Sequence, residues 1–195
     1  GQVKEFYTLT EISASAIEVC STGNSVAATP ISLPIADFEP YEGMLVTFTD
    51  SLYISEYYNF ARYGELVLST ERQFQPTAIF EPGSVEGADL LASNLSLRIK
   101  LDDGNGSQNP DPAMHPNGNI FDMANLFRGG DILNNLTGIM DFDYGEYKIQ
   151  PVTTDYVNAN PRTAQRELPS GQVSPAAVVL FVFLSSAALV VAAWQ

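Results

Sequence analysis

Residues 132–152 read ILNNLTGIMDFDYGEYKIQPV, and this stretch decides the fold. Apolar and polar side chains alternate on both sides of Tyr144-Gly145-Glu146, which is the period of a half-buried strand. The glycine and its two neighbours supply a tight turn between the two runs. The stretch therefore predicts an antiparallel pair of strands that closes a β module.

The segments upstream of this hairpin predict further strands. Residues 42–58 alternate over a length that predicts one long strand, and residues 61–70 and 98–103 predict two shorter ones. Between them, residues 84–99 place leucines partly at helical spacing, which predicts a turn or two of helix. We expect a mainly β fold, a small OB-like Greek-key barrel, for which a generic β-sandwich is the alternative.

A weak internal repeat extends this reading toward the N-terminus. The sequence GQVKEFYTLTEIS of residues 1–13 aligns with GIMDFDYGEYKIQ of residues 138–150. The matched pairs are Gly1 with Gly138, Val3 with Met140, Tyr7 with Tyr144, and Ile12 with Ile149. The repeat predicts that the barrel is preceded by a fragment of a similar module, with a further strand at residues 15–21.

The expected domain organisation follows from these segments and from one apolar run near the C-terminus. The ranges are 1–34 for the C-terminal part of a preceding OB-like module, 35–40 for a linker, 41–152 for the complete module, 153–175 for a second linker and 176–194 for a hydrophobic segment. That last segment, 19 residues without a charge, predicts a C-terminal apolar helix long enough to cross about 30 Å of hydrocarbon. A membrane anchor, a frameshifted or chimeric end, and a helix buried on a partner all remain open.

Composition limits the kinds of partner. The 195 residues include 9 basic and 23 acidic side chains, a net charge of −14, which disfavours a large phosphate-binding surface and suits an extracellular setting. The single cysteine, Cys20, allows neither an internal disulfide nor a cysteine zinc site. The single histidine, His115, lies in a loop rich in proline and glycine, which predicts a surface residue rather than a ligand or a base.

The loop KLDDGNGSQNPDP of residues 100–112 has two readings. Its alternating oxygen-bearing side chains could bind Ca²⁺ or Mg²⁺, and Asp102, Asp103 and Asp111 are the candidate ligands. It is not an EF-hand loop, because Ala113 occupies the place of the twelfth-position glutamate. Glycine, asparagine, aspartate and proline also stabilise turns, so a solvated connection between strands remains the alternative.

The run YEGMLVTFTDSLYISEYYNFARYGELVLS of residues 41–69 resembles a known pattern. It is similar to the non-catalytic N-terminal region of secreted bacterial endonucleases of the ExeM/NucH type, in the endonuclease/exonuclease/phosphatase class. The positions that match are Tyr41, Glu42, Gly43, Met44, Tyr58, Asn59, Arg62, Tyr63, Gly64 and Glu65. Further matches in the same order are LDDG at 101–104, QNPDP at 108–112, Gly130-Asp131, residues 136–151 and NPRT at 160–163.

The resemblance implies an accessory role without hydrolysis by this chain alone. In those nucleases the catalytic domain begins just after the NPRT segment, and here residues 164–179 carry no such strand. One loop histidine cannot supply the positioned His, Asp and Glu that metal-assisted hydrolysis requires. The catalytic nuclease domain is thus an expected partner that is missing from this chain.

The resemblance also implies extracellular DNA as a partner, at the surface or outside the cell. Aromatic and basic residues around the matched run could stack on unpaired bases, and the alternative is that most of the aromatic ones form core. These candidates are Tyr57, Tyr58, Phe60, Arg62 and Tyr63. The alternative function is a membrane-anchored cell-surface interaction module with protein or glycan partners, held through residues 176–194.

Overall fold

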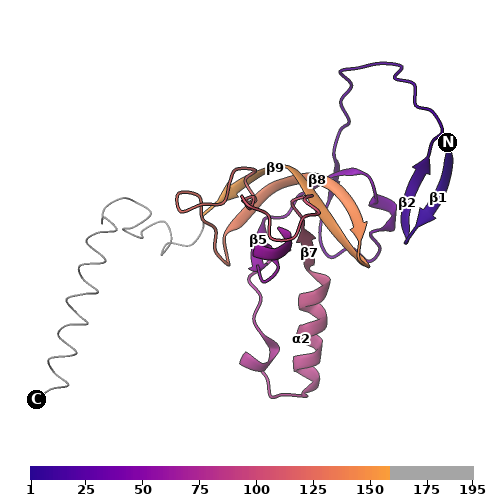
Figure 1. The fold of residues 1–195 in the computed structure, drawn as a ribbon. Coiled ribbons are helices and arrows are strands. Elements are labelled where there is room, and N and C mark those ends of the chain that lie inside the picture. Colours follow the sequence, from indigo (N-terminus) through magenta and orange to yellow (C-terminus); the bar gives the residue numbers. More distant parts are fainter. Residues whose placement is uncertain (159–195) are drawn as a thin grey trace, which may run out of the picture. The chain divides into compact units, whose positions relative to one another are not determined.

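The computed structural model describes residues 1–158, which contain nine strands, two α-helices and two short 3₁₀ helices (Figure 1). The strands are β1 Gln2–Phe6, β2 Leu9–Ser13, β3 Thr29–Ile31, β4 Leu45–Phe48, β5 Leu52–Glu56, β6 Leu66–Ser69, β7 Arg98–Leu101, β8 Ile132–Asp143 and β9 Glu146–Val157. The helices are η1 Glu39–Tyr41, α1 Phe60–Tyr63, η2 Pro76–Ala78 and α2 Val85–Ser96. The prediction of a mainly β fold is confirmed.

Strands β8 and β9 form the long hairpin that the sequence predicts. They pair antiparallel from Ile132 opposite Val157 to Asp143 opposite Glu146, and the turn lies at Tyr144-Gly145. Both turn residues have positive φ, 51° at Tyr144 and 80° at Gly145, as a two-residue hairpin turn matched to strand twist requires. β9 continues through Val157, so the first residues of the expected linker 153–175 are strand.

Five strands close a β-barrel. β5 pairs with β8 and β6, β6 with β7, β7 with β9, and β9 pairs with β8 to complete the ring. The β7–β9 contact is parallel, with Lys100 opposite Lys148 and Leu101 opposite Ile149, whereas the other four contacts are antiparallel. The prediction of a small β-barrel is therefore confirmed.

The long strand expected over residues 42–58 is interrupted. It divides into β4 and β5, which pair with successive parts of the same edge of β8: Leu45 lies opposite Ile139, and Leu52 opposite Leu133. At the break, the Asp50 carboxylate accepts the backbone N–H of Leu33 at 3.0 Å. Leu33 follows β3, which pairs in parallel with the other edge of β4. β3 thus joins the barrel sheet, although it lies within the range 1–34 assigned to a preceding module.

The N-terminal residues form a separate two-stranded sheet, β1 and β2. The further strand expected at residues 15–21 is wrong: residues 14–28 contain no strand, and the side chains of Ile17 and Val19 are exposed. These apolar residues have no neighbouring strand to pair with, and an alternating pattern alone does not make a strand without a partner.

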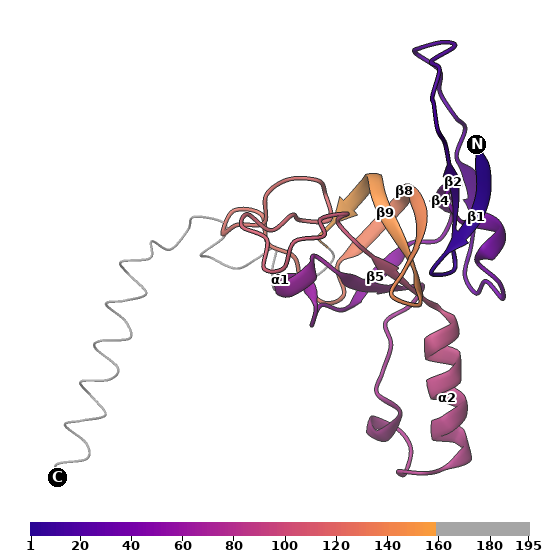
Figure 2. The same ribbon diagram turned by 45° about the vertical axis from the view of Figure 1, so that its right-hand side comes forward.

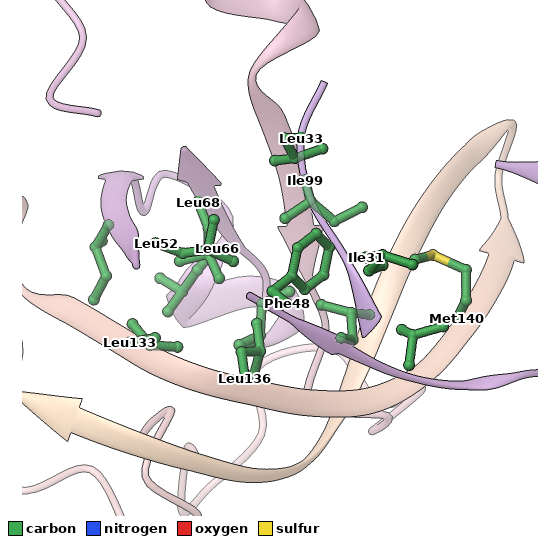
Figure 3. Packing of buried hydrophobic residues seen from close by; sticks show 14 of the residues in the cluster. Ile31, Leu33, Phe48, Leu52, Leu66, Leu68, Ile99, Leu133, Leu136 and Met140 are labelled. Atoms are coloured by element: carbon green, nitrogen blue, oxygen red, sulfur yellow. The ribbon is translucent and has the colours of Figure 1, made fainter. Parts of the chain in front are cut away.

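The core fills the barrel with aliphatic side chains from every strand of the ring (Figure 3). In β7, for example, Ile99 and Leu101 point inward while Arg98 and Lys100 point outward. Phe48 of β4 is fully buried against this set. The buried hydrophobic residues are Ile31, Leu33, Val46, Phe48, Leu52, Ile54, Phe60, Leu66, Leu68, Ile99, Leu101, Leu133, Leu136, Met140 and Ile149.

Residues 70–97 form an arm that leaves the barrel after β6 and returns at β7 (Figures 1 and 2). Ser84 caps α2 by accepting the Gly87 N–H at 3.1 Å, and the helix is longer than the turn or two predicted. Buried Asn94 fixes α2 to the rest of the arm. Its side-chain amide donates to the backbone carbonyl of Phe74 at 2.9 Å, and its backbone carbonyl accepts from the side-chain amide of Gln73 at 2.6 Å. The arm is therefore held by specific hydrogen bonds.

Within residues 1–158, none of the helices has the length and apolar character needed to cross a membrane. The apolar helix expected at residues 176–194, and the linker residues after 158, lie outside the described part of the chain.

Candidate binding face around a buried ion cluster

Lys148 is the centre of an ion cluster on the outer face of the barrel. Its neighbour in β9, Ile149, points into the core, so Lys148 points outward, yet only 3% of its surface is exposed. Its ammonium group donates to the Glu65 carboxylate at 2.7 Å and to the Asp102 carboxylate at 3.0 Å. Burial would lower the pKa of Lys148, but the two carboxylates outweigh burial and raise the pKa above its usual range.

Glu65, which directly precedes β6, connects this lysine to a second one. Its other carboxylate oxygen accepts a hydrogen bond from Asn59 at 2.9 Å and lies 3.5 Å from the Lys100 ammonium. Lys100 in turn pairs with Glu146. Burial would raise the pKa of Glu65, but the partners hold the pKa below its usual range, so the carboxylate stays ionised.

The cluster brings together two separate sequence motifs. Gly64 ends α1 with a φ of 72°, and a Cβ at this position would meet the Asp103 carboxylate at 2.4 Å. Asp103 follows Asp102, and Lys148 binds both Asp102 and Glu65, so the YNFARYGE run and the LDDG run approach each other directly at Gly64 and are also bridged by Lys148. Glycine is required at position 64 both by its positive φ and by this close approach.

Two pockets, each of about 530 Å³, flank the cluster and share Asn59, Glu65, Lys100 and Glu146 as a common wall. The first is lined by Tyr58, Arg98, Tyr147, Phe38 and Leu95. The second is lined by Tyr63, Tyr144, Gln108, Asn105 and Lys148. The cations of this wall already face carboxylates, so the pockets offer aromatic rings and hydrogen-bonding groups rather than a field that attracts phosphate.

The candidate nucleic-acid residues divide between this face and the core. Tyr58 is 87% exposed and Tyr57 is more than half exposed. Arg62 lies 5.0 Å from the centre of the Tyr63 ring, a cation–π contact. Phe60, in contrast, is buried and packs edge-on against Phe121 and Phe127, so it belongs to the core and presents no ring to a base.

The three candidate metal ligands point to different places. Asp102 binds Lys148, Asp103 lies against Gly64, and Asp111 is exposed. Asp102 and Asp103 also accept the backbone N–H groups of Gly104 and Asn105, both at 2.9 Å, which is typical of tight turns. In the described residues, no three His, Cys, Asp or Glu side chains lie close enough together to hold a metal ion.

We expect that replacing Asp103 and Asp111 with Asn reduces the calcium-induced rise in melting temperature only slightly, and no more than the loss of two carboxylates elsewhere. The acidic chain attracts Ca²⁺ diffusely, and losing two carboxylates anywhere should have the same small effect. The matched control replaces Glu81 and Glu86 with Gln. Both variants are melted with and without Ca²⁺ at about 5 mM, a concentration that saturates even weak protein calcium sites. A loss of the rise confined to the first variant would establish a specific site.

His115 is buried, so the prediction that it lies on the surface is wrong. Only 2% of it is exposed, and its ring packs against Phe127 and, edge-on at 4.5 Å between ring centres, against Tyr156. The Nδ1 atom of His115 accepts the backbone N–H of Asn117 at 3.0 Å. The Nε2 atom is buried and makes no hydrogen bond with any residue that the structure describes. The HPNGN sequence forms a turn closed by the His115 N–H and the Asn119 carbonyl, and this turn directs the ring inward.

We expect the protein to become less stable as the pH falls below about 6.5, in part because of His115. Burial lowers the pKa of this imidazole below its ordinary value of 6.5, despite the raising effects of Asn117 and Asp131. The unfolded chain therefore takes up a proton first, so this contribution to stability is complete above pH 6.5 and is lost as the pH falls toward the folded pKa. His115→Asn retains an acceptor for Asn117 and removes the titration.

The measurement is urea unfolding of both proteins at several pH values between 7.5 and 5. The wild type should lose more stability over this interval than His115→Asn. Parallel pH dependences in the two proteins would contradict the assignment.

The fold and the site define this protein as a small closed β-barrel with a buried ion cluster on its outer face. The profile of the family described as "Domain of unknown function (DUF8508)" matches residues 28–161, and the chain belongs to this family. No curated protein and no solved structure matches the chain. The matched range begins just before β3 and includes the whole barrel and the arm.

Proposed function

We propose that the barrel is an accessory, non-catalytic module of an extracellular or surface nuclease that acts on extracellular DNA. In this proposal the module positions single-stranded nucleic acid or spaces a catalytic domain, and the chain alone hydrolyses nothing. The observation that carries the proposal is one hydrogen-bonded unit that joins motifs of the resemblance: Lys148 of residues 136–151 binds Asp102 of LDDG and also Glu65, whose carboxylate accepts from Asn59. Residues that match a family pattern and also depend on each other in space support a shared domain type.

The barrel topology supports the OB type within this proposal. If β4 and β5 are counted as one interrupted strand, the ring runs from it through β6, β7, β9 and β8 and back to it. In chain order, β7 and β9 are the third and fifth of these strands, and they are parallel. OB folds are five-stranded Greek-key barrels, and they bind oligonucleotides on an outer face. Here the longest helix, α2, is inserted between the second and third strands of the ring.

The exposed aromatic residues beside α1 are the proposed contact. Tyr58 and Tyr57 offer rings for stacking, and Arg62 with Tyr63 offers a guanidinium group held against a ring. Stacking of a base on an aromatic side chain contributes about 1–3 kcal/mol and tolerates any base. The surrounding charge is mainly negative, so the proposed binding is weak and depends on few phosphate contacts.

The test is a titration of fluorescein-labelled oligothymidine with residues 1–161, followed by fluorescence anisotropy at low salt. We expect a dissociation constant in the micromolar range and a loss of about fivefold or more in affinity for Tyr58→Ala, because one stacking contact is removed. Tyr7→Ala, an exposed tyrosine in the β1–β2 turn, is the matched control. If no binding is seen with the protein at roughly 100 µM, which is the weak limit of non-specific binding to nucleic acid, only the spacer role remains.

The apolar surface of the arm favours a second function, a cell-surface interaction module with protein or glycan partners. Several large side chains of the arm are exposed although the arm itself is held by specific hydrogen bonds: Phe74, Ile79, Val85, Leu91 and Leu95. Exposed apolar groups of this size on an ordered element are typical of interaction surfaces. If the oligonucleotide titration shows no binding, this function becomes the leading one. Its own test is loss of surface attachment or partner binding in Leu91→Ser with Leu95→Ser.

A further inference from the structure

The two hairpins β1–β2 and β8–β9 have the same pairing register, as the sequence repeat predicts. Val3 lies opposite Ile12, and the aligned residues Met140 and Ile149 lie opposite each other. All five pairs of β1–β2, from Gln2–Ser13 to Phe6–Leu9, coincide with pairs of β8–β9 when 137 is added to each number.

The turns and the first glycines also correspond. Tyr7 and Tyr144 begin the two turns, each with a φ of 51°, and the next residue has positive φ in both hairpins. A Cβ on Gly138 would lie 2.7 Å from the Ile149 side chain and 2.3 Å from the Gln150 carbonyl oxygen. A Cβ on Gly1 would likewise meet the Ile12 side chain at 2.7 Å and the Ser13 carbonyl oxygen at 3.3 Å. The N-terminal hairpin thus has the shape of a hairpin that closes a barrel.

The burial of the two hairpins is opposite. Met140 and Ile149 are fully buried in the barrel, whereas Val3 is 67% and Ile12 71% exposed. A two-stranded hairpin alone is at best marginally stable in water, because it has no sheet to cover its apolar side. The Val3–Ile12 pair therefore requires a cover similar to the one that the barrel strands give to Met140 and Ile149.

The charged pair next to this position is inverted. In β1–β2 the cross-strand pair is Lys4 with Glu11, 2.7 Å apart, and the corresponding pair in β8–β9 is Asp141 with Lys148. Lys148 is the residue that binds Glu65 and Asp102. In a barrel like this one, Glu11 would take the place of Lys148 and face two carboxylates. Like charges at such a buried position are strongly unfavourable, so a second copy of this chain is the wrong partner.

We propose that residues 1–13 are the closing hairpin of a different β-barrel, and that Val3 and Ile12 pack into a module that supplies the other three strands of a five-stranded barrel and lacks a closing hairpin of its own. That module has this barrel's topology and carries Lys or Arg where this chain has Glu65 and Asp102. Apolar complementarity provides the attraction, and the inverted charge pair selects this module over the barrel of residues 28–157.

The experiment replaces residues 138–150 of the full chain with the sequence of residues 1–13 in two versions. The direct graft, GQVKEFYTLTEIS, puts a glutamate at position 148. The exchanged graft, GQVDEFYTLTKIS, restores the aspartate and lysine at positions 141 and 148. Both grafts lose the Phe142–Tyr147 contact equally, so they are a matched pair. We expect the exchanged graft to fold cooperatively and to melt at least about 10 °C above the direct graft.

Two further variants make the result decisive. Glu65→Gln with Asp102→Asn should recover much of the melting temperature of the direct graft, since it removes the repulsion. The second variant is an exchanged graft in which Gln2 and Val3 change places, and Ile12 and Ser13 change places. This graft should not fold, because the apolar pair then faces solvent. An exchanged graft that fails to fold, or melts no higher than the direct graft, would overturn the proposal.

The oligomeric state of the wild-type chain tests the exclusion of a second copy. Light scattering after size exclusion should give the same mass for the wild type and for Val3→Asp with Ile12→Asp. An association that this double substitution abolishes would show that the hairpin binds another copy, and the assignment of a different barrel would then be wrong.

Discussion

Replacing Lys148 with Met lowers the free energy of unfolding by about 3 kcal/mol, measured by urea unfolding at pH 7 and followed by far-ultraviolet circular dichroism. Methionine fills a similar volume in β9, but Glu65 and Asp102 lose the ammonium group that each now binds. Removing one partner from a buried ion pair costs about 3–5 kcal/mol, because the remaining charge is left without compensation. The lower end applies here, since Lys100 still faces Glu65.

The control is Lys4→Met in the N-terminal hairpin. Lys4 and Glu11 form an ion pair of the same 2.7 Å length as Lys148 and Glu65, but their side chains are 46% and 36% exposed, against 4% and 10% for the buried pair. Exposed ion pairs contribute about 0–1 kcal/mol, so this variant should unfold almost like the wild type. Equal losses in the two variants would mean that the cluster has no special role in holding the barrel face together.

Replacing Gly138 with Ala lowers the free energy of unfolding by about 3 kcal/mol, at the upper end of the range for overpacking. The new Cβ would lie 2.3 Å from the backbone oxygen of Gln150 and 2.7 Å from the Ile149 side chain. A backbone oxygen in a paired strand cannot move aside as a side chain can, so the β8–β9 ladder must shift. The expected readout is an earlier urea midpoint together with lost amide protection in both strands.

Gly106→Ala is the matched control for this substitution. Gly106 lies in the loop after β7, and a Cβ there would meet nothing within 4 Å. We expect a change in unfolding free energy smaller than about 0.5 kcal/mol, as for surface substitutions away from special features. A destabilisation of Gly138→Ala no greater than that of Gly106→Ala would contradict the close approach.

The sequence predicts the closing hairpin well because both of its signals are local. Alternation over residues 132–143 and 146–157 and the glycine at position 145 depend only on neighbours in the chain. The same holds for α2, whose Ser84 cap and leucine spacing lie within one segment. Local patterns of this kind determine the type of an element more reliably than its limits.

The errors arise where distant residues decide the outcome. The long strand is interrupted between β4 and β5, where the Asp50 carboxylate accepts the N–H of Leu33, a contact that no local pattern in residues 42–58 reveals. His115 looks like a surface residue in its own loop, but it completes an aromatic cluster with Phe127, and the same cluster decides that Phe60 is core. Single-sequence patterns report composition and period, and they do not report which loops cover each other.

The candidate site follows the same division. The resemblance identifies Asn59, Gly64, Glu65 and the LDDG loop, yet it assigns them no structural role. Lys148 is absent from every predicted site, because a lysine in a strand next to an isoleucine normally points to solvent. One signal could have identified it: its counterpart in the internal repeat is Glu11, a reversal of charge at an otherwise similar position.

The arm between β6 and β7 leaves and rejoins the barrel at two residues that are direct neighbours, since Ser69 pairs with Arg98. Because the two ends of the arm are held side by side in the sheet, the barrel does not require the arm to have any particular length. Doubling the length of a flexible loop costs only about 0.6 kcal/mol in closure entropy. Evolution can therefore lengthen, trim or exchange this segment while the barrel remains intact, and an engineer can insert a reporter domain there with the same freedom.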